Sequence, residues 1–211
     1  LRSAERPKIV LAPGSPGFGD PKRPKYVIHF WARAVDEGDY DDPQPNISMN
    51  QMFIGIDLVL GPDNPGAVGI RHRAAQGSGV QDCTIDATGA LAGLEGGAGS
   101  GGSHANVTVI GGRFGADLRE TQPAPTIVGF NLIDQREAAL LCGSRQALTA
   151  VGLRIETDTE GPVIVTRQNR GPHHGQLCLV DSEIVFRKPG NNTAIDAAAS
   201  LYLDNLYLHN A

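Results

Sequence analysis

A short apolar motif recurs seven times after residue 50 and restricts the fold more than any other feature of the chain. Each copy has an apolar residue, any residue, then Gly, Asp or Asn, two further residues and a second apolar residue. The central residues are Gly55, Asp82, Gly111, Gly129, Gly152, Asp181 and Asn205. They are separated by 27, 29, 18, 23, 29 and 24 residues, a loose period of the length found in stacked repeat proteins.

The motif predicts an all-β fold, a right-handed, single-stranded parallel β-helix. Gly, Asp and Asn tolerate the left-handed backbone region, so each can form a sharp bend between two short strands. The flanking apolar residues then point inward at a period of two. The alternative is an antiparallel sandwich, which needs hairpin dipeptides such as Asn-Gly between neighbouring apolar runs. Because such dipeptides are nearly absent, the β-helix is favoured.

The chain divides into an N-terminal segment, residues 1–48, and the predicted β-helix, residues 49–211. The first segment holds seven of the 14 prolines and two apolar runs, at 9–11 and 26–31, where we expect two short strands. The final run SLYLDNLYLHNA keeps the repeat pattern and shows no polar cap. Since an open last coil exposes a sheet edge, we expect the β-helix to continue beyond this chain or to pack against a second β-helix segment or chain.

Composition excludes several classes of partner. The formal net charge is -5 and the pI is about 5.6, without a basic stripe, so no nucleic acid partner is expected. No run of 18 apolar residues occurs, so the chain is not expected to span a membrane, and its start lacks the uninterrupted apolar stretch of a signal peptide.

Cysteines and histidines predict neither a metal site nor a cofactor. The chain has an odd number of cysteines without CxxC spacing, Cys83, Cys142 and Cys178. We interpret them as small core residues; the alternative, if the protein is secreted, is that two of them form one disulfide. His173 and His174 are adjacent, and adjacent residues of a strand point to opposite faces. Joint ligation of a metal by this pair would need a sharp bend.

The stretch GGAGSGGS, residues 96–103, resembles a flexible linker in composition but lies inside one predicted coil. A linker there would separate coils whose stacked faces need each other, at a cost of about 25 cal/mol per Å² of exposed apolar surface. We therefore expect an ordered turn, with the hydroxyls of Ser100 and Ser103 and free backbone N–H groups exposed in a groove.

Three segments follow one another in the first half of the predicted β-helix: GAVGIRHRAAQGSGVQDCTI, GAGSGGSHANVTVIGGRFGA and, after Gln122, VGFNL. Their order and spacing resemble the first half of the family 55 glycoside hydrolases, β-1,3-glucanases built from two side-by-side β-helices. The resemblance covers about residues 50–135. Gln76 matches the Gln of the family's "AQ" segment, Ser100 the Ser of its "GSGG" turn, and Gln122 the second Gln of its "QQ" pair.

The resemblance implies that Gln76, Ser100 and Gln122 contact sugar hydroxyls, while the general acid is a Glu of a second helix outside this chain. Neutral donors and acceptors of this kind bind hydroxyls without a charge to desolvate. An internal amide ladder between coils is the alternative for the glutamines. The family's Trp after "GIH" has no match beside His72, where Arg73 follows.

Hydrolysis of a glycosidic bond normally needs two carboxyl groups. Candidates outside the inward positions are Glu95, Asp117, Glu120, Asp134 and Glu137, of which Glu95 and Glu120 lie beside the matched segments and form the predicted catalytic pair. His72 and His104 flank the same region and are candidates for substrate binding.

The sequence therefore predicts an extracellular or periplasmic glycoside hydrolase acting on a β-glucan-like polysaccharide, with substrate near the 96–103 turn. Two alternatives stay open. Arg71, Arg73 and Arg119 could neutralise a uronate in a polysaccharide lyase, although no Asp-rich calcium cluster accompanies them. A non-catalytic glycan-binding or adhesion β-helix would need no carboxylate pair.

Overall fold

Two parallel β-sheets make up the computed structural model, which describes residues 5–30, 47–99, 101–119, 126–168 and 174–211. No helix occurs among these residues. Sheet A has 11 strands: β1 (Lys8–Val10), β3 (Met52–Ile54), β4 (Asp57–Val59), β6 (Gly79–Asp86), β8 (Ser103–Ile110), β10 (Thr126–Val128), β11 (Asn131–Ile133), β13 (Leu148–Val151), β14 (Arg154–Thr157), β16 (Leu177–Phe186) and β18 (Leu201–His209). Sheet B has seven: β2 (Lys25–Phe30), β5 (Ala67–His72), β7 (Ala92–Glu95), β9 (Phe114–Leu118), β12 (Ala138–Cys142), β15 (Ile164–Thr166) and β17 (Ile195–Ala197).

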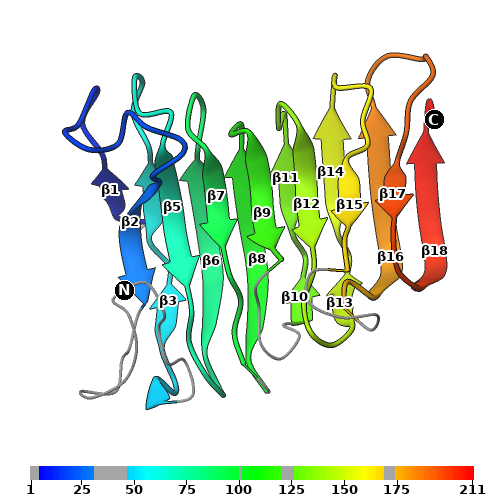
Figure 1. The fold of residues 1–211 in the computed structure, drawn as a ribbon, viewed down its shortest axis with the longest axis horizontal. Coiled ribbons are helices and arrows are strands. Elements are labelled where there is room, and N and C mark those ends of the chain that lie inside the picture. The colour runs from blue at the N-terminus through cyan, green and yellow to red at the C-terminus, as the bar shows by residue number, and fades with distance from the viewer. Residues whose placement is uncertain (1–4, 31–46, 100, 120–125, 169–173) are drawn as a thin grey trace.

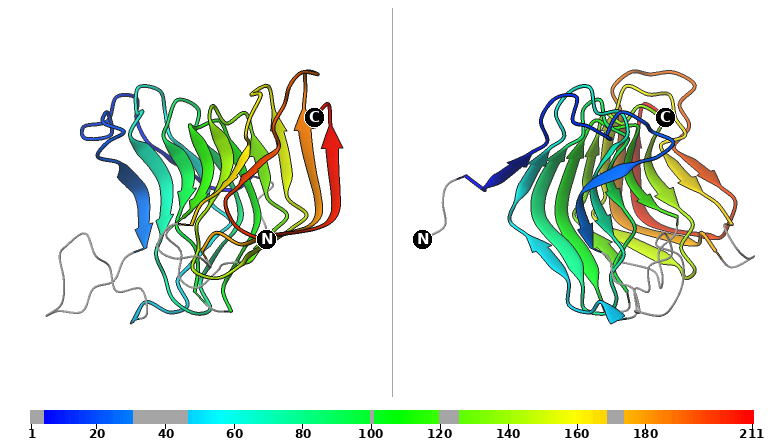
Figure 2. Two further views of the ribbon diagram at one scale, coloured as in Figure 1. Left: turned by 45° about the vertical axis from the view of Figure 1, so that its right-hand side comes forward. Right: turned by 60° about the vertical axis from the view of Figure 1, so that its left-hand side comes forward.

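The chain alternates between the two sheets. From β3 onward it runs through sheet A, crosses to one strand of sheet B and returns, and we call one such circuit a pass. Each strand pairs in parallel with strands of neighbouring passes. The passes lie side by side from β1 and β2 at one end to β18 at the other (Figure 1), and the two sheets lie opposite one another (Figure 2). The predicted all-β class and parallel pairing are confirmed.

A line of left-handed residues divides sheet A into two halves. One such residue separates β3 from β4, β10 from β11 and β13 from β14, and one lies in the middle of each longer strand. Their φ values lie between 49° and 70°. The line consists of Gly55, Asp82, Asn106, Gly129, Gly152, Asp181 and Asn205, which the pairing registers place opposite one another. Six of these seven are motif centres identified in the sequence.

The seventh motif centre was assigned to the wrong residue. In β8 the bend falls at Asn106, with φ 53°, and not at Gly111. Gly111 also has a positive φ, 69°, but it follows β8 at the next corner. Along the true line, the side-chain amide of Asn106 donates to Asp82 at 3.0 Å, and that of Asn205 donates to Asp181 at 2.9 Å. Asp82 and Asp181 are therefore bend residues, as their place in the motif predicted.

Three rows of apolar side chains fill the space between the sheets. One row lies before the left-handed line in sheet A and includes Val80 and Leu179, and a second follows the line and includes Ile85 and Ile184. The third comes from sheet B and includes Leu94. All five side chains are buried. Burial of one such side chain contributes about 1.5–3 kcal/mol, so the stacked rows are the main source of stability.

The two apolar runs of the N-terminal segment extend both sheets. They form β1, which pairs with β4, and β2, which pairs with β5. Asn64 holds the connection between them: its buried side chain accepts from Ser15 N at 2.8 Å and donates to Ala12 O at 2.9 Å. Pairing thereby joins residues far apart in sequence at one end of the molecule.

Candidate functional site

A row of charged side chains crosses the outer face of sheet B. The registers place Arg71 of β5 opposite Glu95 of β7, and Glu95 opposite Asp117 of β9. The residues before them in each strand, Ile70 and Leu94 among them, are fully buried. Because alternate residues of a strand face opposite sides, the charged residues face outward. Neighbouring strands lie about 4.8 Å apart, so two carboxylates stand side by side here.

Glu95 is held by a cation and a phenol. Arg71 Nε lies 3.3 Å from Glu95 Oε1, and both side chains are mostly covered, at 15% and 23% exposed. The Tyr26 hydroxyl also hydrogen-bonds Glu95, and the Arg71 guanidinium lies 4.7 Å from the Tyr26 ring centroid. Burial, followed by the negative charge of Glu95, raises the pKa of Tyr26. The phenol therefore keeps its proton at neutral pH and acts as a donor.

Asp117 has its own arginine. Arg119 Nε and Arg119 Nη2 donate to the two Asp117 oxygens at 2.9 Å and 2.6 Å, a bidentate pair that fixes the orientation of the carboxylate. The same guanidinium lies 6.0 Å from the ring centroid of Phe114. We refer to Tyr26, Arg71, Glu95, Asp117 and Arg119 together as the Glu95 face. It offers carboxylate acceptors, guanidinium and phenol donors and aromatic carbon on one exposed sheet surface.

His29 borders the Glu95 face opposite Arg71 in the register of β2 and β5. Its ring lies 4.8 Å from that of Tyr26. Partial burial, together with the positive charges of Arg71 and Arg73, lowers the pKa of His29 to about 4. His29 is thus a neutral hydrogen-bonding group at physiological pH, and it brings no further positive charge to this surface.

The structure places the other predicted site residues differently. Gln76 is exposed, in the turn after β5, and its backbone carbonyl accepts from Asn50 N at 3.0 Å. Ser100, Glu120 and Gln122 lie outside the described residues. Of the predicted catalytic pair, the structure therefore positions Glu95, and the carboxylate that it places beside Glu95 is Asp117.

His72 and His104 lie in the interior, which corrects their interpretation as groups that contact substrate. Both are 0% exposed. Their rings meet edge to face at 5.0 Å, between the rings of Phe30 and Phe130. His72 Nε2 lies 3.2 Å from Gln51 O. A glycan on the outside of the sheets cannot reach either imidazole.

In the described part of the glycine-rich stretch, residues 96–99 and 101–103, several backbone N–H groups are already hydrogen-bonded. Gly96 N donates to Asp117 O at 2.8 Å, Gly99 N to Ala74 O at 3.1 Å and Gly102 N to Gly99 O at 2.9 Å. A Cβ at Gly99 would lie 2.8 Å from the carbonyl carbon of a residue in the preceding pass. The expected groove of free N–H groups is therefore not present at these three glycines, which instead allow close stacking.

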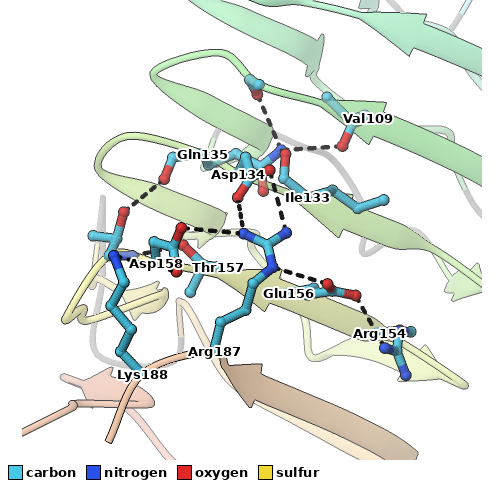
Figure 3. A network of polar contacts seen from close by, with 12 residues as sticks. Val109, Ile133, Asp134, Gln135, Arg154, Glu156, Thr157, Asp158, Arg187 and Lys188 are labelled. Carbon is cyan, nitrogen blue, oxygen red and sulfur yellow. Dashed lines mark hydrogen bonds and ion pairs between the residues drawn. The ribbon is translucent and has the colours of Figure 1, made fainter. Parts of the chain in front are cut away.

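The remaining described carboxylate candidates form ion pairs with arginines outside the set that makes up the Glu95 face. Glu137 pairs with Arg113 at 2.5 Å. Asp134 belongs to a network on sheet A in which Arg187 contacts Asp134 at 2.5 Å and Glu156 at 2.9 Å (Figure 3). Hydrogen bonds from Arg187 lower the pKa of Glu156. These ion pairs join neighbouring passes at the surface, so a structural role is sufficient to explain these carboxylates.

Sequence reasoning named Arg71, Glu95, Asp117 and Arg119 as candidates but missed Tyr26 and His29, and it did not predict that these residues are neighbours, although a signal for that exists. Three strands of sheet B, β5, β7 and β9, share a four-residue pattern in which the second residue is Gly and the fourth is charged: Val68-Gly69-Ile70-Arg71, Ala92-Gly93-Leu94-Glu95 and Phe114-Gly115-Ala116-Asp117. Gly69 and Gly115 are required because a Cβ would come within 2.6 Å of a carbonyl oxygen in the next pass. Aligning these three segments brings Arg71, Glu95 and Asp117 together without the structure.

All three cysteines are free; Cys83 and Cys142 are buried and Cys178 is partly exposed. Within the described ranges, no cluster of three or more His, Cys, Asp or Glu side chains could hold a metal ion. The same part of the chain contains no helix of the length and apolar character needed to cross a membrane. Comparison with known proteins finds no matching family model, no matching curated protein and no matching solved structure.

Proposed function

We propose that the chain is a right-handed parallel β-helix that binds a polysaccharide on the Glu95 face and hydrolyses it as a glycoside hydrolase. The pairing of Glu95 with Asp117 across β7 and β9 is the observation that supports this proposal. Adjacent paired residues of parallel strands have their Cα atoms about 4.8 Å apart, and retaining glycosidases use two carboxyl groups at a similar separation, about 5 Å. The alternation of sheet A and sheet B passes supports the solenoid.

The contacts suggest different roles for the two carboxylates. Asp117 is oriented by the bidentate contact of Arg119, which suits a nucleophile or a stabiliser of positive charge on the sugar ring. Glu95 has a longer contact to Arg71, at 3.3 Å, and a protonated Tyr26 beside it. A sugar hydroxyl that displaces Arg71 would leave Glu95 able to exchange a proton, as an acid/base group requires.

A neutral β-glucan suits this surface better than a uronate polymer. The Arg71 guanidinium is already paired with Glu95, and that of Arg119 with Asp117. A uronate carboxylate would therefore meet two negative charges whose cations are engaged, which weakens the case for a lyase. An extracellular or periplasmic location follows from a polysaccharide substrate and is proposed with it.

A non-catalytic glycan-binding module is the second candidate. It is favoured by the same arginine contacts, because each carboxylate already has a guanidinium as its partner, an arrangement that a binding surface needs no chemistry to explain. On this alternative the Glu95 face binds the glycan through charged hydrogen bonds, and no bond is broken.

Hydrolysis and binding are separated by following reducing ends and absorbance of unsaturated products on β-1,3-glucan, other neutral glucans, arabinan, pectin and alginate. We expect reducing ends from a neutral glucan and a loss of about 10²-fold or more in Glu95→Gln and Asp117→Asn. Glu156→Gln is the matched control, since Glu156 is also paired with an arginine, Arg187, but lies in β14 of sheet A.

Binding by affinity electrophoresis without reducing ends would support the module and refute the hydrolase. An ultraviolet signal on pectin or alginate would instead indicate a lyase. Full activity in both Glu95→Gln and Asp117→Asn would remove the Glu95 face from the proposal.

A further inference from the structure

The two interior histidines each have one ring nitrogen without a hydrogen-bond partner among the described residues, His72 Nδ1 and His104 Nε2. Both side chains are 0% exposed, so bulk water does not solvate these atoms. Buried polar groups of native proteins almost always have a partner, and each exception needs a physical explanation. What each nitrogen can bond to depends on whether it carries a hydrogen.

The backbone contacts of the two rings fix which nitrogen carries the hydrogen. Val80 N donates to His104 Nδ1 at 2.9 Å, so the neutral ring of His104 carries its hydrogen on Nε2. His72 Nε2 lies 3.2 Å from Gln51 O, and because a carbonyl oxygen only accepts, the hydrogen of His72 is also on Nε2. Burial lowers the pKa of both histidines, which keeps the rings neutral at physiological pH. The two partnerless atoms are thus complementary: His104 Nε2 is a donor and His72 Nδ1 is an acceptor.

The two rings lie close together without a direct hydrogen bond. They meet edge to face, with centroids 5.0 Å apart and planes at 87° to one another. Their other aromatic neighbours are Phe30 and Phe130, which have no N–H or O–H group to donate and no lone pair to accept with. One water molecule can bridge two atoms up to about 6 Å apart, since each of its hydrogen bonds is about 3 Å long. Rings at the observed separation are within that reach.

We propose that one internal water molecule bridges the two histidines, accepting a hydrogen bond from His104 Nε2 and donating one to His72 Nδ1. Internal waters bind where buried polar groups would otherwise lack partners. The water completes a series in which each group donates to the next: Val80 N–H, His104, the water, His72 and Gln51 O. Every ring nitrogen of both histidines then has a partner.

This series of hydrogen bonds connects three consecutive passes. Gln51 precedes β3 and His72 ends β5, in one pass, whereas Val80 lies in β6 of the next pass and His104 in β8 of the pass after that. The linked groups lie at the end of a sheet B strand and near the starts of sheet A strands, so the bonds join the two sheets at one corner. His72 follows Arg71 of the Glu95 face, so the water also helps to fix the end of the strand that carries Arg71.

The same pair of atoms does not suit a metal ion. A metal ligand must offer a lone pair, and a ligating histidine usually donates from its other ring nitrogen to a carbonyl or carboxylate. His72 meets both conditions. His104 meets neither, because its partnerless nitrogen carries the hydrogen and its other nitrogen accepts from Val80 N. One donor and one acceptor select a water molecule, which can accept and donate at once.

The proposal is independent of the proposed function and is tested by a high-resolution crystal structure of the 211-residue chain. We expect a water peak about 2.7–3.2 Å from both His104 Nε2 and His72 Nδ1. Two substitutions at one position form a matched pair. His72→Asn places a carboxamide oxygen near the position of Nδ1 and should keep the water, whereas His72→Phe has no acceptor there and should lose it.

NMR spectra of the histidine-labelled chain near neutral pH test the assignment of the hydrogens. We expect both rings to be neutral, with the hydrogen on Nε2, and the Nε2 hydrogen of His104 to show cross-peaks to a long-lived water. His29, which is also neutral but borders the surface, is the internal control and should show exchange with bulk water only.

A direct bond between the two nitrogen atoms, the absence of a water peak beside them or a metal ion bound to them would refute the proposal. A hydrogen on Nδ1 of either ring would refute the donor and acceptor assignment, and retention of the water in His72→Phe would show that His72 does not hold it. Far-UV circular dichroism ensures that both variants are folded, and the results for the unsubstituted chain do not depend on them.

Discussion

Acid should destabilise this protein through its two interior histidines. Burial lowers the pKa of His72 to about 4 from an ordinary 6.5. Burial, and next the charge of His72, lowers the pKa of His104 well below 6.5. The aromatic rings that contact these imidazoles are those of Phe30 and Phe130. No carboxylate contributes to the pKa shift of either histidine, so no negative charge offsets the effect of burial. The folded protein therefore holds both imidazoles neutral, whereas the unfolded chain can protonate them.

The sign and size of the effect follow from linkage. Because the folded pKa is lowered, the unfolded state binds more protons, so stability is present above pH 6.5 and is lost as the pH falls from there through about 4. A shift of one pKa unit corresponds to about 1.4 kcal/mol. The shift of His72 alone therefore removes about 2 kcal/mol at pH 5 and about 3 kcal/mol well below pH 4. His104 acts in the same direction.

Urea unfolding followed by far-UV circular dichroism at pH 7.5, 6.0 and 5.0 measures this loss. Carboxylates such as Glu156, whose pKa is lowered by Arg187, lose their contribution only near and below the ordinary value of 4.5, so histidines dominate this range. His72→Phe should be less stable at pH 7.5, because it loses the contact to Gln51 O, but its stability should fall less between pH 7.5 and pH 5.0. His29, which is solvent-exposed, contributes less and is common to both proteins.

Equal pH dependence in the wild type and in His72→Phe would refute the reasoning. So would a wild type whose free energy of unfolding is constant between pH 7.5 and pH 5.0, since two neutral interior imidazoles cannot be protonated without cost.

Three further predictions concern the scaffold. Gly99→Ala should lower the free energy of unfolding by about 1–3 kcal/mol, because the new Cβ would collide with the backbone of the preceding pass. Gly19→Ala is the control and should change this free energy by less than about 0.5 kcal/mol, because no heavy atom lies within 4 Å of the new Cβ. Equal urea midpoints of the two variants would contradict this prediction. Asn106→Ala should cost about 1–2 kcal/mol through its left-handed φ, and Asn106→Gly less; equal loss in both would contradict the left-handed line as the cause. Burial raises the pKa of Cys83 to about 12, so in a thiol titration of the native protein at pH 8 only Cys178 should react quickly, and a fast reaction of all three thiols would exclude a packed core.

The bends were predictable because their cause is local. A residue that must take a positive φ is chosen for its own backbone, so Gly, Asp or Asn marks the position whatever surrounds it. The same locality explains the error in β8. Asn106 and Gly111 both tolerate the left-handed region and both adopt it, and a motif read along the chain cannot tell which of them joins the line across sheet A.

The histidines were assigned to the surface because residue type was weighed before strand parity. His72 lies two residues after Ile70 in β5, both are fully buried, and parity alone predicts that these two residues share a face. The close packing of the glycine-rich turn was harder to predict. The need for Gly99 arises from the backbone of the preceding pass, and only the stacking distance reveals that contact.

The pairing register between β7 and β9 determines which side chains are neighbours in the candidate site. Glu95 and Asp117 are 22 residues apart, and the pairing of β7 with β9 places them opposite one another. Pass length alone does not set this register, because successive residues of the left-handed line are 27, 24, 23, 23, 29 and 24 residues apart and still lie opposite one another. The turns absorb the differences in length, so contacts between the passes have to hold the register. The N–H of Gly96 is bonded to Asp117 O, and this bond ties the end of β7 to the strand that carries Asp117. Gly96 and Gly99 therefore serve the proposed site indirectly: by stacking on the neighbouring passes without side chains, they help to hold the register that keeps the two carboxylates side by side.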